Sequence, residues 1–270
     1  DDGGEWWLGE FMRVIILLTM LSFASLLCIA EERAEMPNLH DPEVFKKIIS
    51  EAVELESLKK ADGSDQFFKI NEPLPFDGSG WGVTYWDKDK IQGLYQFKNG
   101  KLNGWALAWW PNGKALSKSY WRKGKQHGMF RLYFETGKKK AELNYENGLV
   151  NGIGREWDEN GQLRRVFDNL NGALNGSATT WHENGVKKNQ SEWKNDKRHG
   201  FYTEWYENGQ KMVEVNWEDG KMDGLRTEWY ENGQKADEVM YKEGKYEGFG
   251  ITWHENGQKY VEANYKEGKY

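Results

Sequence analysis

The five histidines come first among the residues that could do chemistry, because four of them are regularly spaced. His182 and His254 lie 72 residues apart, as do His127 and His199, while His40 stands alone. If the chain between the members of a pair forms six strands of a sheet, as argued below, their rings are separated by roughly 29 Å. One metal ion needs all its ligands within a few ångströms. We therefore predict surface imidazoles and no metal site.

Carboxylates, glycines and the single cysteine form no catalytic pattern either. Asp and Glu total 43 residues. A glycosidase needs two of them held roughly 5–9 Å apart in one cleft, and columns of repeated Glu would supply that spacing everywhere. The sequence has no nucleophile elbow and no phosphate-binding loop, and Cys28 lies in an apolar segment near the N-terminus. We predict no catalytic residue and no cofactor; an enzyme with an unrecognised site is the alternative.

The composition favours a thin, solvated protein. Hydrophobic residues make up 38% of the 270 residues, and Phe, Trp and Tyr make up 15%, so aromatic rings must provide most of the burial. The 31 glycines, against 5 prolines, indicate many tight turns. Basic and acidic residues, 37 and 43 in number, are mixed along the chain and give a net charge of −6. Such mixing argues against a nucleic-acid partner.

Residues 12–30 have the pattern of a secretory signal peptide. Arg13 is followed by a run of seventeen mostly apolar residues that ends in a small residue, Ala30, where cleavage is expected. The acidic residues 1–11 are a poor leader for export, so we expect them to be an upstream or non-native segment. The signal predicts an exported protein that is periplasmic, bound to the cell surface or secreted. A membrane anchor formed by the same apolar segment is the alternative.

Residues 31–80 are predicted to be a linker and an N-terminal helix that caps the structure that follows. A helix is expected over 41–60, because Asp41 can cap its N-terminus and proline and glutamate follow in the first turn. Its apolar stripe consists of Val44, Ile48, Val53 and Leu55. Together with residues 67–76, this helix is expected to cover the first edge of a sheet.

From residue 81 onward the chain repeats every 24 residues. The units begin at Trp81, Trp105, Met129, Ile153, Ser177, Phe201, Leu225 and Phe249. We number the columns of the repeat 1 to 24 by position within the unit. Column 5 is always aromatic, column 17 is aromatic except for Asn169 in the fourth unit, and column 24 is Gly in every complete unit. Residues 81–270 are therefore one repeat array.

Each unit is predicted to be one antiparallel β-hairpin. Asn-Gly pairs such as Asn208-Gly209 are typical of two-residue hairpin turns, and a second turn, such as residues 218–221, closes the other end. In the sixth unit the alternating positions are Phe201, Thr203 and Trp205 on one strand and Val213, Val215 and Trp217 on the next. One hairpin cannot bury its aromatic side alone, but stacked hairpins share a continuous apolar strip.

The fold class predicted is therefore all-β: an elongated antiparallel array of about eight 24-residue hairpins, preceded by a short helix. The predicted aromatic core consists of Trp109, Trp157, Trp181, Trp205, Trp229 and Trp253 in column 5, with Trp121, Trp193 and Trp217 in column 17. The last unit stops short at Tyr270. Its open edge strand is expected to favour strand addition by a partner or self-association.

The unit GLRTEWYENGQKADEVMYKEGKYEG, residues 224–248, resembles the MORN-repeat variant of bacterial proteins, including the YwqK-like antitoxin family. The resemblance covers residues 81–270. The pattern departs at 87–90, where DKDK replaces the Asn-Gly turn, and at Asn169. The resemblance implies a β-hairpin ribbon with a binding or scaffolding role and no catalytic residues. The family name also implies an antitoxin-like role in neutralising a partner protein.

Column 6 is the candidate binding surface. Its side chains follow column 5 directly and so point to the opposite face, where they add a second aromatic column beyond what one buried strip requires. The candidate residues are Trp86, Trp110, Phe134, Tyr206, Tyr230 and His254. Partial packing of both faces is the structural alternative.

Together these features predict a non-enzymatic, exported MORN-like protein that acts as a protein-interaction or scaffolding surface. A protein partner is expected, and no nucleic acid. The alternatives are an envelope module that binds lipid or wall glycan, with association to membrane or cell wall, and an antitoxin-like neutraliser of a partner protein.

Overall fold

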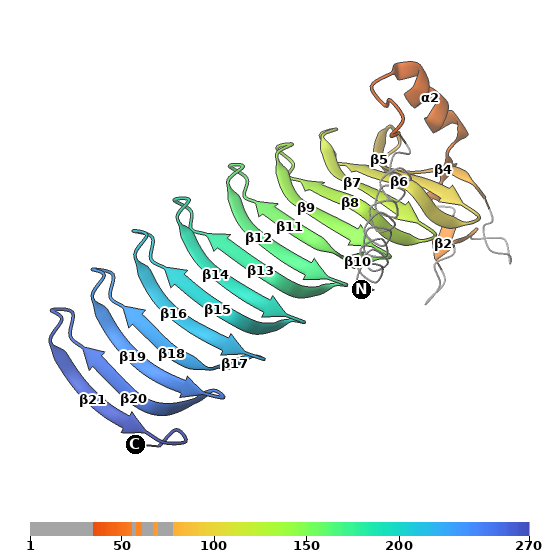
Figure 1. Cartoon of the computed structure of the whole chain (residues 1–270). Coiled ribbons are helices and arrows are strands. Elements are labelled where there is room, and N and C mark those ends of the chain that lie inside the picture. Colours follow the sequence, from red (N-terminus) through yellow and green to blue (C-terminus); the bar gives the residue numbers. More distant parts are fainter. Residues whose placement is uncertain (1–34, 56–57, 61–66, 70–77, 270) are drawn as a thin grey trace, which may run out of the picture. The chain divides into compact units, whose positions relative to one another are not determined.

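The computed structural model describes residues 35–55, 58–60, 67–69 and 78–269 (Figure 1). The predicted signal peptide and the segment before it, residues 1–30, lie outside these ranges. The chain divides into two compact units, residues 1–50 and 51–270, and each is described by itself.

The predicted helix is present but shorter than expected. Helix α2 runs over Pro42–Glu51. The Asp41 carboxylate caps it by accepting hydrogen bonds from the backbone N–H groups of Glu43 (2.9 Å) and Val44 (3.3 Å). The prediction that the helix continues to residue 60 was wrong. The β-branched Val53 lies in an extended segment whose backbone pairs with the repeat sheet.

That extended segment is β1 (Val53–Glu54), which pairs in parallel with β4 (Gly80–Asp87). Val53 lies opposite Gly82, and the Leu55 side chain occupies the space above this glycine, where a Cβ would come within 2.5 Å of it. Part of the first sheet edge is therefore covered by a strand. A separate two-stranded sheet joins β2 (Leu58–Lys60) and β3 (Phe67–Lys69); the rest of the predicted cap, residues 70–76, lies outside the described residues.

The repeat array forms one sheet, in which β1 and the repeat strands make 19 strands among the described residues. After β4 the strands are β5 (Lys90–Lys98), β6 (Lys101–Trp109), β7 (Ala115–Arg122), β8 (Lys125–Tyr133), β9 (Lys139–Glu146), β10 (Leu149–Val150), β11 (Gly152–Trp157), β12 (Leu163–Leu170), β13 (Ala173–Trp181), β14 (Lys187–Lys194), β15 (Lys197–Trp205), β16 (Lys211–Glu218), β17 (Lys221–Met222), β18 (Gly224–Trp229), β19 (Lys235–Lys242), β20 (Lys245–Trp253) and β21 (Lys259–Tyr265). From β4 onward the strands follow one another along the ribbon in antiparallel pairs, and β10 and β11 both pair with β9, as β17 and β18 both pair with β16 (Figure 1). This confirms the predicted hairpin array.

The two turns of each unit differ, and the first is not the two-residue turn predicted. At the first turn the N–H of column 9 donates to the carbonyl of column 6, and the N–H of column 6 donates to the carbonyl of column 10, as in Gly209 to Tyr206 (3.0 Å) and Tyr206 to Gln210 (2.9 Å). Of the Asn-Gly pair, only the glycine has a positive φ, 86° at Gly209. This is a three-residue loop closed by a left-handed glycine.

The second turn is the true two-residue turn. Both of its central residues have positive φ, as in Glu243 (49°) and Gly244 (81°), which is the geometry of a type I′ turn. Because loop length sets register, the two turn types fix which side chains share a face.

The register places the predicted apolar positions on both faces instead of one strip. Column 1 lies opposite column 16, and column 2 lies opposite column 15, as in Phe201 with Asn216 and Tyr202 with Val215. Phe201 and Val215 therefore point to opposite faces. We call the face with columns 1, 3, 14 and 16 face 1, and the face with columns 2, 15, 17 and 22 face 2. Both faces bury side chains.

Face 2 holds the most continuous core. Columns 2 and 15 contribute its buried residues, which are mostly small and are Ala106, Ser119, Phe167, Ala178, Ser191, Val215, Val239 and Ala263. Beside them, columns 17 and 22 pair directly across the second turn and alternate along the array, as in Trp217 with Met222 and Tyr241 with Tyr246. The ring of Tyr246 lies 4.9 Å from that of Tyr241 and 5.1 Å from that of Tyr265 in the next unit. We call this row the spine.

We predict that Gly244→Ala lowers the free energy of unfolding by about 1–2 kcal/mol, because an L side chain at φ 81° is strained. Gly244→Asn should cost less, since asparagine tolerates this region. Urea unfolding of the three proteins measures the difference. Equal losses in both variants would contradict the backbone explanation.

Candidate binding surfaces

The predicted binding residues of column 6 bind the next hairpin of the same chain. Trp86 and Trp110 donate their indole N–H to the carbonyls of Trp109 (3.0 Å) and Tyr133 (3.2 Å). Tyr206 donates its hydroxyl to the carbonyl of Trp229 (2.8 Å). In each case the acceptor is column 5 of the following unit. The same is true of Tyr230 with Trp253 (2.7 Å) and His182 with Trp205 (2.8 Å).

These hydrogen bonds give column 6 a structural role that the sequence reading missed. The sheet register shifts at column 5, between Glu204 and Trp205 for example, and a ring with a polar tip reaches this carbonyl from the preceding unit. This accounts for the Trp, Tyr and His side chains of the column. Most of them are half-buried, whereas Trp86 is 43% exposed.

Three members of the column differ. Phe134 has no polar tip, and the ammonium of Lys140 lies 5.3 Å from its ring. His254 in the last described unit is exposed and packs on Tyr260, with ring centroids 4.7 Å apart. In the fourth unit Asp158 pairs with Arg164 (2.7 Å), and the guanidinium donates in turn to the carbonyl of His182. The backbone hydrogen bond from Gln162 and the Arg164 charge hold the pKa of Asp158 below its usual range.

Four of the column 5 tryptophans, Trp157, Trp205, Trp229 and Trp253, each have a lysine ammonium group over the ring. The column 11 lysine of one unit places its ammonium over the column 5 ring of the next, at 5.2 to 5.9 Å, and also bonds to the column 14 side chain of its own unit. Lys211, for example, lies over Trp229 (5.6 Å) and pairs with Glu214 (3.0 Å). These tryptophans are half-buried and pack within the array.

Column 1 is the most exposed apolar column, and the sequence reading missed it. Five of its members are large apolar residues exposed by 40–65%. They are Met129, Ile153, Phe201, Leu225 and Phe249, which we call the apolar row. The sheet register explains this exposure, because column 1 lies opposite the mostly polar column 16 across the hairpin, as Phe201 does opposite Asn216. Most members of the apolar row therefore face a polar residue on the neighbouring strand of the same hairpin.

Face 2 carries a half-buried ionisable cluster that extends from the end of the fifth unit into the seventh. The Arg198 guanidinium lies 4.4 Å from the Tyr202 ring and 5.0 Å from the Trp217 ring. The Tyr202 hydroxyl donates to Glu204 (2.7 Å), and burial together with this carboxylate raises the pKa of Tyr202 to about 12. Burial also raises the pKa of Asp237, which pairs with Arg226 on the same face. Every ionised group named here has an opposite charge or a ring beside it, so the cluster is a packing network.

The histidines stand far apart in the array. In column 23, His199 accepts a hydrogen bond from the backbone of Asp219 in the next unit (3.4 Å). His127 in the same column is buried, and neither of its ring nitrogens has a partner among the described residues. Among the described residues, no group of three His, Cys, Asp or Glu could hold a metal ion.

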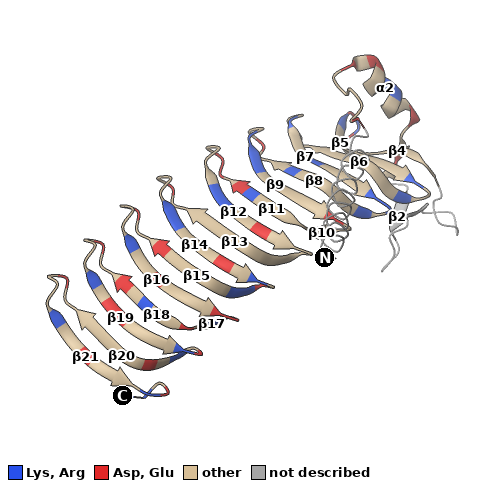
Figure 2. Ribbon diagram, in the orientation of Figure 1, with Lys and Arg blue, Asp and Glu red and all other residues tan. Residues whose placement is uncertain are grey.

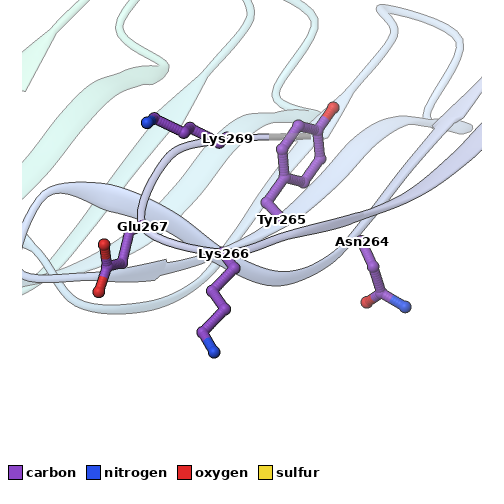
Figure 3. Close-up of a pocket in the computed structure, with 5 residues that line it drawn as sticks. All are labelled: Asn264, Tyr265, Lys266, Glu267 and Lys269. Atoms are coloured by element: carbon purple, nitrogen blue, oxygen red, sulfur yellow. The ribbon is translucent and has the colours of Figure 1, made fainter.

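A shallow hollow lies at the last described hairpin, with a volume of about 610 Å³. Figure 3 shows its lining, in which Tyr265 and Asn264 of β21 are joined by Lys266, Glu267 and Lys269 of the following turn. It is open to solvent.

Five segments of the chain match the family model of the MORN repeat variant, at residues 126–147, 174–195, 198–219, 222–243 and 246–267. Each match spans the first turn of a unit and the strand on either side of it. The hairpin array is a MORN-repeat array. No curated protein matches the chain. The MORN match is consistent with the 24-residue period. MORN repeats are a non-catalytic type of repeat.

Two solved structures are similar to part of this chain. They are entitled "Crystal Structure of TcdB2-TccC3-TEV" and "Crystal Structure of TcdB2-TccC3-Cdc42", and are 11% and 12% identical to this chain. Each match covers 66% of this chain but only 12% of the other, with a TM-score of 0.20. This TM-score carries no argument about fold or function. Within the described residues, no helix has the length and apolar character needed to cross a membrane.

We predict that Tyr230→Phe destabilises the last hairpin by about 1 kcal/mol, because the Trp253 carbonyl loses its hydroxyl donor. Hydrogen exchange of β20 and β21 and urea unfolding measure the effect. Tyr260→Phe is the matched control, since Tyr260 is 67% exposed and its change should leave exchange unaltered. Similar hydrogen exchange in both variants would contradict the structural role given to the column 6 hydrogen bond.

We predict that Tyr202 makes the stability of the array fall at alkaline pH. Its folded pKa of about 12 lies above the ordinary value of 10.0, so the unfolded chain releases the proton first. The stabilisation is complete below the ordinary pKa and is lost as pH rises from there through the folded pKa. Chemical unfolding across this range should show a shallower decline for Tyr202→Phe. Identical slopes in both proteins would show that Tyr202 contributes nothing to the decline.

Proposed function

We propose that this MORN-repeat protein is an exported, non-enzymatic interaction module that binds a protein partner through the apolar row of face 1. The observation that carries the proposal is the exposure of this row, which reaches 65% at Phe201 and 49% at Ile153. Exposed apolar side chains that are aligned on one face mark interaction sites more often than scattered ones do.

The geometry of face 1 supports a partner that follows the array. Two strands per unit place members of the row in neighbouring units roughly 9.6 Å apart, and Ser177 separates Ile153 from Phe201. The strands are joined to both neighbours by backbone ladders, so these side chains project from a rigid surface and little order must be gained on binding. Export rests on the predicted signal peptide alone. The lipid, wall-glycan and antitoxin-like roles stay alternatives from the sequence.

Affinity capture with Phe201→Ser/Leu225→Ser tests the proposal. We expect a partner that is retained by the wild-type chain to be lost from this variant, because both residues are exposed and their change removes contact area without opening the core. Leu149→Ser/Leu170→Ser is the control, since both leucines are 49% exposed but lie outside the row. Partners that remain bound to both variants, or are lost from both, would count against the apolar row.

A further inference from the structure

The apolar row belongs to a longer line of side chains along face 1. Column 1 lies opposite column 16 in each hairpin, as in Ile153 with Asp168, so the two columns alternate along the array. We call these two columns, from residue 129 to residue 264, the face 1 line. Its only charged members are Asp168 and Glu192. Figure 2 shows in red the single acidic residue of β12 and of β14. The line therefore carries charge at one place, and that charge is negative.

The two carboxylates flank the interruption in the apolar row. Ser177, the polar member of column 1, is exposed and comes between Ile153 and Phe201 in the row. Each carboxylate lies over the column 24 glycine that ends its unit, where a Cβ would come too close to it. Glu192 also accepts a hydrogen bond from the N–H of Phe201 (3.2 Å). Asp168 therefore lies on the strand before Ser177 and Glu192 on the strand after it, and both are held on the face 1 line.

Neither carboxylate has a charged partner within the part of the chain that the structure describes. The exposed cations Arg155 and Lys194 lie on face 1 two residues off the line, toward the first and the second turn respectively. A partner that follows the line therefore meets two acids and a small neutral residue between them. A cationic side chain fits this place by charge and by size, because serine leaves room where other members of column 1 project a large side chain.

The spacing of the face 1 line selects the conformation of the partner. Column 1 recurs every two strands, roughly 9.6 Å. A polyproline II segment presents every third residue on one side, at roughly 9.3 Å per turn. An α-helix presents residues seven apart, at roughly 10.5 Å, and a β-strand presents alternate residues, at roughly 6.6 Å. Over the three steps from Ile153 to Leu225 the polyproline II segment stays in register to about 1 Å, whereas the helix is out of register by about 3 Å.

We propose that the face 1 line binds a polyproline II segment of a protein partner, in which a cationic residue is spaced three residues from apolar ones. The cation lies between Asp168 and Glu192, and the apolar residues cover Ile153, Phe201 and Leu225. A polyproline II segment is already extended and stiff, so it loses little conformational entropy when it binds a rigid surface. This site rests on the protein-binding function proposed above and defines the segment that the same surface takes.

The test measures binding of the fluorescein-labelled peptide LPPRPPLPPL to the full chain by fluorescence anisotropy. Its arginine and its leucines fall at three-residue spacing. One comparison peptide has the same composition with the leucines and the arginine moved out of this spacing. A second presents the same four side chains seven residues apart on an alanine-rich helix. We expect LPPRPPLPPL to bind roughly tenfold more tightly than either comparison peptide.

Asp168→Asn/Glu192→Gln tests the position of the cation. We expect this variant to bind LPPRPPLPPL roughly tenfold more weakly and with less salt dependence, but to bind LPPQPPLPPL as the wild type does. Both changes suit the fold, because asparagine occupies column 16 in other units. Gln96 in the same column also accepts the equivalent backbone hydrogen bond, from Trp105 (2.7 Å).

The matched control is Glu231→Gln/Glu255→Gln, which removes two exposed charges from first turns and should leave binding within about twofold of the wild type. Equal weakening by both double variants would overturn the position of the cation. No binding of LPPRPPLPPL, or tighter binding of either comparison peptide, would overturn the polyproline II segment. If Phe201→Ser/Leu225→Ser still loses its captured partner in that case, the proposed function stands and only this inference fails.

Discussion

The hydrogen bond from a column 6 side chain to the column 5 carbonyl of the next unit is the interaction on which the array depends. At column 5, just before the first turn, the register of the backbone hydrogen-bond ladder shifts, as it does between Glu228 and Trp229. A side chain from the preceding hairpin supplies the donor, as Tyr206 does for Trp229. The column 8 asparagine adds a second bond a few residues away, from Asn208 to the carbonyl of Glu231 (2.8 Å). Each hairpin thus has backbone carbonyls whose hydrogen-bond donors come from the preceding hairpin. For this reason a single repeat is not expected to be stable alone.

Much of the fold could be predicted from the sequence, because period, turn residues and alternation all report on local structure. The hairpins, their number and the aromatic columns followed from the 24-residue spacing. The assignment of faces did not, because it depends on whether a turn has two residues or three. Asn208-Gly209 has the sequence of a two-residue turn but only its glycine is left-handed. One residue of difference moves a strand's side chains to the other face.

The same effect explains the candidate sites. Column 6 is aromatic because it reaches a backbone acceptor, and this could not be seen without knowing which carbonyl lies beside it. Column 1 looked like core until the register placed Phe201 opposite Asn216.

The fourth unit interrupts both of the features that join hairpins. Its spine position is Asn169, which is buried with its amide nitrogen lacking a partner among the described residues, and its column 6 side chain is Asp158, which acts through Arg164. In a linear array, cooperativity is transmitted only from neighbour to neighbour, so the weakest junction decides where it ends. The array should therefore melt as two segments on either side of this unit, and a pulling force along it should separate them there first.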